Sequence, residues 1–182
     1  HGDVFAEVDS FFEGAPEAVA RRLAAFARAA AKTIADHDEP FDVVHAQGSL
    51  GAAVVPLVSV PTVLSVHGTD APTFAPALAS ILGDSAIQVG GLCSPLHAGL
   101  AAASRVTSAS RSHADELMKR HDISEERMSA IPRGIDASVW NPLTDAHLPS
   151  RFDPVDRSGK AKCKSDLQRD LDLPVRDDLP LI

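Results

Sequence analysis

Apolar positions follow two different periods along this chain. Between residues 16 and 35 they recur every three or four positions, which predicts an amphipathic helix with a proline in its first turn. Short β-branched runs predict buried strands at residues 42–46, 62–66, 105–109 and 127–131. Shorter helices are predicted near residues 50–57, 76–82, 95–103 and 110–120, and the rest of residues 71–92 is predicted to be loop. Strands alternating with helices are typical of βαβ units, so the sequence predicts an α/β fold with a parallel sheet.

Polar residues stand where each predicted strand ends. In open α/β sheets, ligands bind outside the carboxyl ends of the strands. The candidate site loops are therefore those around Gln47, residues 67–70, residues 108–110 and residues 133–136. We expect Gln47, His67 and Asp70 to share one depression at this edge, with Asp136 on its border.

Composition excludes several classes of function. The chain of 182 residues has 17 basic and 25 acidic residues, and a formal charge of −8 disfavours a nucleic-acid partner. No apolar run is long enough for a membrane span, so we expect no membrane partner. The two cysteines are expected to be free thiols, and no Cys or His spacing suggests a metal. A dehydrogenase-like nucleotide protein is disfavoured because no strand is followed by G-x-G-x-x-G.

The predicted elements suggest two parts. Residues 1–142 are expected to form a partial N-terminal domain, and residues 143–182 a linker, a helix capped by Ser158 and the first strand of another domain. The chain lacks an initiator Met and stops on Pro-Leu-Ile, which predicts a strand that has only begun. We therefore expect a fold that is truncated at both ends.

Three linked motifs in the last third of the chain carry a specific resemblance. Residues 133–145, RGIDASVWNPLTD, resemble the G-[IV]-D-x-x-x-W-x-P-x-x-D segment of bacterial glycogen synthases and plant starch synthases. Residues 148–152, LPSRF, resemble that family's "LPARY", and residues 159–168, GKAKCKSDLQ, resemble its "GKAxNKxxLQ" helix. Looser matches occur at residues 23–30, 42–46, 61–67 and 98–107, so the resemblance covers most of the chain.

This resemblance implies a GT-B type glycosyltransferase with two Rossmann-type domains facing across a cleft, of which this chain carries the acceptor-side half. The donor it implies is ADP-glucose or UDP-glucose. The acceptor is the non-reducing end of an α-1,4-glucan, the anomeric configuration is retained, and no cofactor or metal takes part. The implied location is the cytoplasm, or the plastid if the source is a plant or an alga.

The resemblance also assigns site residues. Gln47 and His67 are the expected catalytic-cleft residues, and the expected substrate-binding residues are His45, Gly68, Asp70 and Asp136. From the residues alone, a hydrogen-bonded core histidine is the favoured interpretation of His45, and capping of local backbone amides that of Asp136. For His67 two interpretations remain open: it contacts a sugar in the cleft, or it is a turn histidine that hydrogen-bonds the backbone. His113 and His121 are expected to be solvated helix residues.

Two departures leave the function open. The second His of the family's "HAHDW" is Gln47 here, followed by Gly-Ser, and the Asn of "NGID" is Arg133. Glutamine can donate a hydrogen bond to a sugar hydroxyl but cannot carry a proton. The family's "KTGGL" loop would precede residue 1, and its donor-binding residues would follow residue 182. The chain is therefore expected to be part of an α-glucan synthase that is inactive alone or, as the alternative, a non-catalytic glucan-binding or regulatory module.

Overall fold

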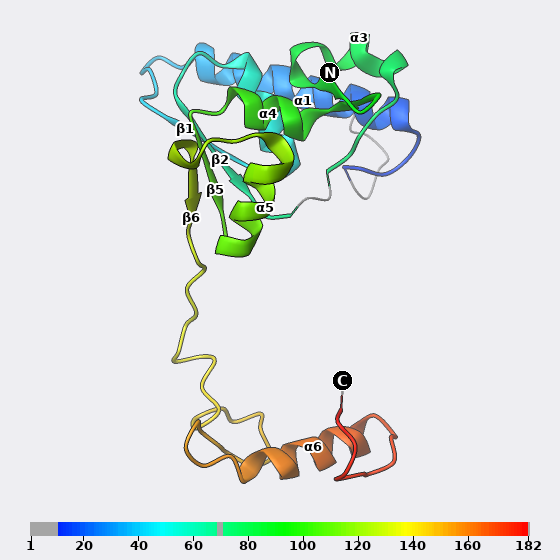
Figure 1. Ribbon diagram of the computed structural model, residues 1–182, viewed down its shortest axis with the longest axis vertical. Helices are drawn as coiled ribbons and strands as arrows, with labels where there is room; N and C mark the ends of the chain where they lie inside the picture. Colours follow the sequence, from blue (N-terminus) through cyan, green and yellow to red (C-terminus); the bar gives the residue numbers. More distant parts are fainter. Residues whose placement is uncertain (1–10, 69–70, 182) are drawn as a thin grey trace. The chain divides into compact units, whose positions relative to one another are not determined.

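The computed structural model describes residues 11–68 and 71–181 of the chain (Figure 1). Contacts divide the chain into two compact units, His1–Arg133 and Gly134–Ile182. This division falls earlier than the domain boundary expected after residue 142. The first unit contains the sheet, and the second is built around a single helix, α6 (Gly159–Asp170).

The sheet of the first unit has four parallel strands, as the sequence predicts. They are ordered β1 (Val44–Gln47), β2 (Thr62–Val66), β5 (Arg105–Ser108) and β6 (Met128–Ala130). Because all four run the same way, their carboxyl ends lie along one edge of the sheet.

One helix precedes these strands and others connect them. The first, α1, runs from Pro16 to Ala35 as predicted. The helices between the strands also lie near their predicted places: α2 (Gly48–Val54), α3 (Ala79–Leu82), α4 (Pro95–Ala102) and α5 (Arg111–His121). Ser110 caps α5, because its hydroxyl oxygen accepts a hydrogen bond from the backbone N–H of His113 at 3.2 Å.

One hairpin contradicts the expectation of loop between residues 71 and 92. β3 (Ile87–Val89) pairs with β4 (Leu92–Ser94) in antiparallel fashion. Gly90 and Gly91 make the two-residue turn at φ values of 57° and 78°, the left-handed conformation that hairpin turns of this length favour. Three-residue strands are too short to leave a clear alternating pattern, so the glycine pair was their only signal.

The two faces of the four-stranded sheet differ in character. One face is apolar, and its side chains Ala46, Leu64, Val66 and Val106 are buried in one cluster with residues of α2, α4 and α5. Figure 1 shows α4 and α5 beside these strands. The alternate positions form the opposite face, which we call the open face because its side chains are exposed or half-buried: His45, Gln47, Ser65, Thr107 and Ser129. Ligands can therefore reach the sheet from this side.

In the second unit, α6 contacts the segment around Ser150 and the end of the chain. The thiol of Cys163 donates to the carbonyl of Ser150 at 3.1 Å, and Lys164 Nζ donates to the carbonyl of Asp177 at 3.1 Å. Lys164 thus connects the chain end to the helix. Ser158 precedes α6 but its side chain makes no capping hydrogen bond. Residues 180 and 181 form no strand, contrary to expectation, and Ile182 lies outside the described residues.

Candidate functional site

The carboxyl ends of β1 and β2 bring two predicted site residues into contact. Gln47 ends β1 and pairs in register with Ser65 of β2, two residues before His67. Their side chains project on the open face, where His67 Nε2 lies 3.2 Å from Gln47 Oε1. Both side chains are exposed. The expectation that these two residues meet at one edge of the sheet agrees with this contact.

Arg133 is a third member of this cluster. It lies just after β6, and its Nη2 atom is 3.2 Å from His67 Nδ1. The sequence placed Arg133 in a candidate site loop, residues 133–136, because this loop follows the fourth parallel strand, and it noted Arg133 as a departure from the synthase motif. It gave Arg133 no role of its own. We call Gln47, His67 and Arg133 the edge cluster.

His45 is not a core residue, although a core histidine was the favoured interpretation of its strand position. Its side chain is exposed because it lies two residues before Gln47 and therefore on the same open face. His45 Nε2 lies 2.8 Å from Ser65 Oγ, and Ser65 Oγ lies 2.7 Å from Thr107 Oγ1. A row of polar side chains thus crosses β1, β2 and β5 beside the edge cluster.

The remaining predicted site residues lie in different surroundings. Gly68 is exposed directly after His67. Asp70 lies outside the described residues. Asp136 belongs to the second unit, where its Oδ1 accepts hydrogen bonds from the hydroxyl of Ser138 at 2.6 Å and from its backbone N–H at 2.9 Å. These two hydrogen bonds lower the pKa of Asp136 below its ordinary value. Its local capping of backbone is therefore as predicted.

The helix histidines are not solvated, contrary to expectation. His113 Nδ1 lies 2.7 Å from Ser108 Oγ at the end of β5. The ring of His121 packs at 4.1 Å from the ring of His97 on α4, and His121 Nδ1 is buried without a hydrogen-bond partner among the residues that the structure describes. Burial, followed by the charges of His97 and Arg120, lowers the pKa of His121 to about 4. His121 therefore contacts a neighbouring helix, and His113 contacts the end of a strand.

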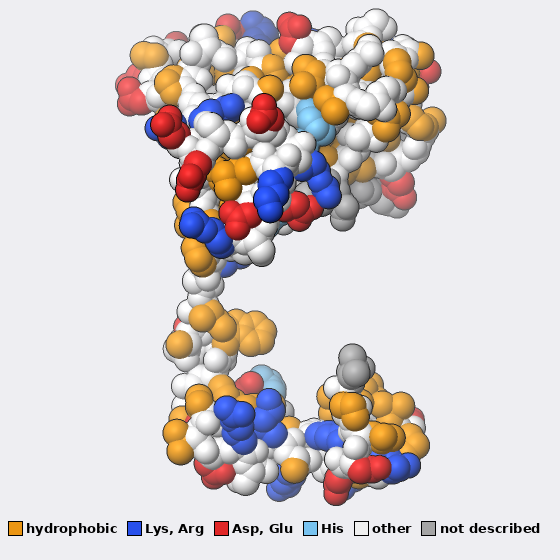
Figure 2. Space-filling model, viewed as in Figure 1, with side chains coloured by type: hydrophobic (Ala, Val, Ile, Leu, Met, Phe, Trp, Pro, Cys, Tyr) orange, Lys and Arg blue, Asp and Glu red, His pale blue; other side chains and the backbone are white. Residues whose placement is uncertain are grey.

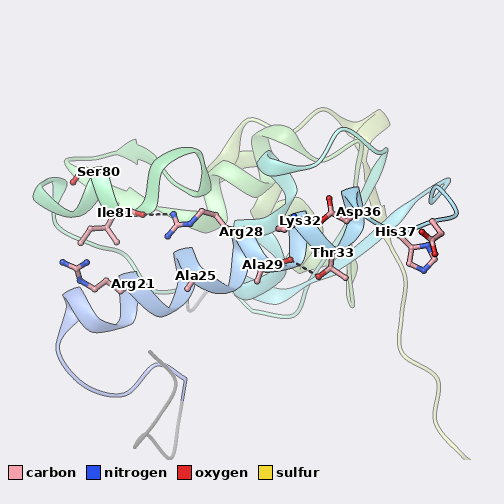
Figure 3. Close-up of a pocket in the computed structure, with 11 residues that line it drawn as sticks. Arg21, Ala25, Arg28, Ala29, Lys32, Thr33, Asp36, His37, Ser80 and Ile81 are labelled. Carbon is pink, nitrogen blue, oxygen red and sulfur yellow. Dashed lines mark hydrogen bonds and ion pairs between the residues drawn. The ribbon is translucent and has the colours of Figure 1, made fainter. Parts of the chain in front are cut away.

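A depression lies elsewhere, on the exposed side of α1 (Figure 3). It encloses about 1130 Å³ between α1 and the segment around α3. Three of its charged side chains have partners: Arg21 pairs with Glu17, Lys32 with Asp36, and Arg28 donates to the carbonyl of Ile81 at 3.4 Å. The depression is lined by α1, the residues after it and α3, and not by the carboxyl ends of the strands, so the edge cluster is the better candidate.

Surface charge and metal-binding groups limit the kinds of ligand that the chain can hold. Figure 2 shows acidic and basic side chains intermixed over α5, without a patch of one sign. Among residues 11–68 and 71–181, no three His, Cys, Asp or Glu side chains are placed to hold a metal ion. No helix in the same ranges is long and apolar enough to cross a membrane. The edge cluster itself consists of an amide, an imidazole and a guanidinium group, which can bind a ligand through hydrogen bonds.

These features define a Rossmann-like α/β domain with a polar site at the carboxyl edge of its sheet. The sequence pattern of Glycosyltransferase Family 4 matches residues 5–139. This match spans most of the chain, and the chain belongs to that family.

Relatives with curated names agree with the motifs. A glycogen synthase of Bordetella bronchiseptica is 36% identical over 96% of this chain and 39% of its own length. The soluble starch synthase 1 of Solanum tuberosum, described as chloroplastic/amyloplastic, is 37% identical over 53% of this chain and 16% of its own length. The resemblance to glycogen and starch synthases is thus confirmed, and the chain spans about two fifths of the length of the Bordetella relative.

A solved structure shows the same fold. The catalytic domain of starch synthase IV from Arabidopsis thaliana, bound to ADP and acarbose, matches 96% of this chain and 41% of its own chain. The TM-score is 0.64 and the sequence identity is 23%. The predicted GT-B type fold is confirmed by this likeness.

Proposed function

We propose that this chain forms the acceptor-side part of an α-1,4-glucan synthase that transfers glucose from a nucleotide sugar to the non-reducing end of a glucan. The family membership and the synthase relatives support the class of reaction. Relatives of this kind also support a location in the cytoplasm, or in the plastid if the source is a plant or an alga.

The observation that carries this proposal is the edge cluster. Gln47, His67 and Arg133 are hydrogen-bonded to one another, exposed, and at the edge of a parallel sheet where ligands bind. Amide, imidazole and guanidinium groups can hydrogen-bond the hydroxyl groups of a sugar. We assign Gln47 and His67 to the catalytic cleft, and His45, Gly68, Asp70 and Asp136 to substrate binding.

The donor we propose is ADP-glucose, with UDP-glucose as the other candidate. The solved starch synthase IV domain is described as bound to ADP and acarbose, which supports an adenine nucleotide and an α-glucan-like acceptor. We further propose that the 182-residue chain alone transfers no glucose. Departure of the nucleotide needs preorganised positive charge where negative charge develops, and the resemblance assigns that role to residues of the donor-side domain.

Affinity electrophoresis of the chain in native gels containing glycogen tests the proposal. The chain is expected to migrate more slowly as glycogen is added, and Gln47→Ala or His67→Ala should restore much of the mobility. Gln88→Ala is the matched control because Gln88 is an exposed glutamine of β3, outside the edge cluster. Equal mobility with and without glycogen would contradict acceptor binding.

A transfer assay tests separately the claim that the chain alone transfers no glucose. With labelled ADP-glucose and glycogen, the chain is expected to give no incorporation above the blank. Incorporation by the chain alone would show that it holds a complete active site. The synthase relatives favour a catalytic parent over a non-catalytic module, and the comparison of Gln47→His below distinguishes the two.

A further inference from the structure

We propose that Arg133 is a positioning residue: it fixes the direction of the hydrogen bonds in the edge cluster, so that Gln47 presents its amide N–H groups to the ligand. This inference rests on the proposed function for the identity of the ligand, and on the geometry of the cluster for everything else. It assigns a role to a residue that replaces the Asn of the synthase motif.

The direction of the hydrogen bond between Arg133 and His67 follows from the chemistry of arginine. A guanidinium group can only donate hydrogen bonds, and it stays charged at any ordinary pH. Arg133 Nη2 lies 3.2 Å from His67 Nδ1, so Nδ1 must accept with its lone pair. A neutral imidazole with an accepting Nδ1 carries its hydrogen on Nε2. Arg133 thereby selects one of the two tautomers of His67.

The second hydrogen bond transmits this choice to Gln47. His67 Nε2–H donates to Gln47 Oε1 at 3.2 Å, so the carbonyl oxygen of the amide is engaged inside the cluster. No hydrogen bond joins Gln47 Nε2 to any of the described residues 11–68 and 71–181. Both N–H groups of that amide are therefore left for a ligand.

The resulting site is rich in donors. The amide N–H groups of Gln47 and the remaining N–H groups of Arg133 all need acceptors, which the hydroxyl and ring oxygens of a glucose residue supply. The Asn of the synthase motif could donate or accept, so it would not impose one direction. Arg133 thus specifies a ligand that approaches with acceptor oxygens.

The tautomer of His67 can be measured directly on the chain. Long-range ¹H–¹⁵N correlation spectra of the 182-residue protein should show His67 protonated at Nε2 and unprotonated at Nδ1. In Arg133→Met, which loses the donor, both tautomers should be populated. Arg133→Lys should preserve the single tautomer because lysine also can only donate. If Arg133 only stabilised the fold, the tautomer of His67 would not depend on whether residue 133 can donate a hydrogen bond.

Arg105→Met is the matched control. It removes one charge from an exposed arginine at the start of β5, at the opposite end of the strand from the edge cluster, and should leave the His67 tautomer unchanged. A wild-type His67 protonated at Nδ1, or an unchanged tautomer in Arg133→Met, would overturn the positioning role.

A binding measurement tests the donor character of Gln47. Gln47→Glu keeps the shape of the side chain but replaces its donors by acceptors, and should weaken retention by glycogen about tenfold or more. Unchanged retention would contradict the assignment of the amide N–H groups to the ligand. If glycogen is not bound while the tautomer responds as expected, the proposed function fails and the positioning role stands. If glycogen is bound while Arg133→Met leaves the tautomer unchanged, the positioning role fails and the proposed function stands.

Discussion

Gly99 of α4 lies so close to Ala52 of α2 that a Cβ atom added at position 99 would come within 2.6 Å of the Ala52 carbonyl oxygen. Both residues are buried, and both helices pack against the apolar face of the sheet. The backbone oxygen cannot move aside as the end of a flexible side chain could. A glycine is therefore required for α2 and α4 to approach this closely.

We predict that Gly99→Ala lowers the free energy of unfolding by about 1–3 kcal/mol, the usual effect of overpacking a well-filled core. Urea unfolding followed by circular dichroism measures it. Gly134→Ala is the control: nothing lies within 4 Å of a Cβ at that position, so its effect should stay within about 0.5 kcal/mol. Equal stabilities of wild type and Gly99→Ala would show that the two helices can separate freely.

The contact between His97 and His121 predicts a loss of stability in acid. The pKa of His121 is lowered from 6.5 to about 4, first by burial and then by the charges of His97 and Arg120, the latter paired with Glu116 at 2.9 Å. Above pH 6.5 the ring is neutral in both the folded and the unfolded chain. Between pH 6.5 and about 4, the unfolded chain binds a proton that the folded ring does not, so stability falls as the pH falls.

Because the ring is only partly buried, solvent reduces this effect, and we expect a loss of about 1–2 kcal/mol. Urea midpoints at pH 7 and at pH 4.5 measure it, and His121→Phe should remove much of the difference. The exposed Gln88 of β3 gives the control, since it cannot titrate and Gln88→Ala should leave the pH dependence unchanged. A wild-type midpoint that does not change between these pH values would contradict the lowered pKa of His121 beside His97.

Gln47→His distinguishes a divergent synthase from a binding module. In a longer protein that carries this segment ahead of a donor-binding domain, the substitution should raise the rate of glucose transfer by about tenfold or more, because it restores a group able to carry a proton. Labelled glucose incorporation measures it, with Gln88→His as the control at an exposed position of β3. An unchanged rate together with retained glucan binding would favour the non-catalytic module.

Strongly periodic or β-branched segments of the fold could be predicted from the sequence. The helix over residues 16–35 and the four parallel strands lie where their patterns predicted them, because each pattern reports a face that is buried. The hairpin of β3 and β4 could not be predicted in this way. Its strands are mostly exposed and three residues long, so they leave little periodicity.

The candidate site could be predicted in part. Gln47 and His67 were found because both follow strands of one parallel sheet. His45 was misjudged because an apolar-looking strand gives no sign of which face lies open, and a shift of one residue reverses inside and outside. The contact of Arg133 depends on β6 lying at the same edge as β2, two strands away, and this order is a property of the folded sheet.

The central claim is that a glucan binds at the edge cluster, and titration of the ¹⁵N-labelled chain with maltoheptaose tests it most directly. The largest changes in backbone and side-chain amide signals are predicted at Gln47, His67, Gly68 and Arg133, with little change along α1. The side-chain amide of Gln47 should shift most, because its N–H groups contact the sugar. Changes confined to the depression on α1, or no change at millimolar sugar, would contradict the account.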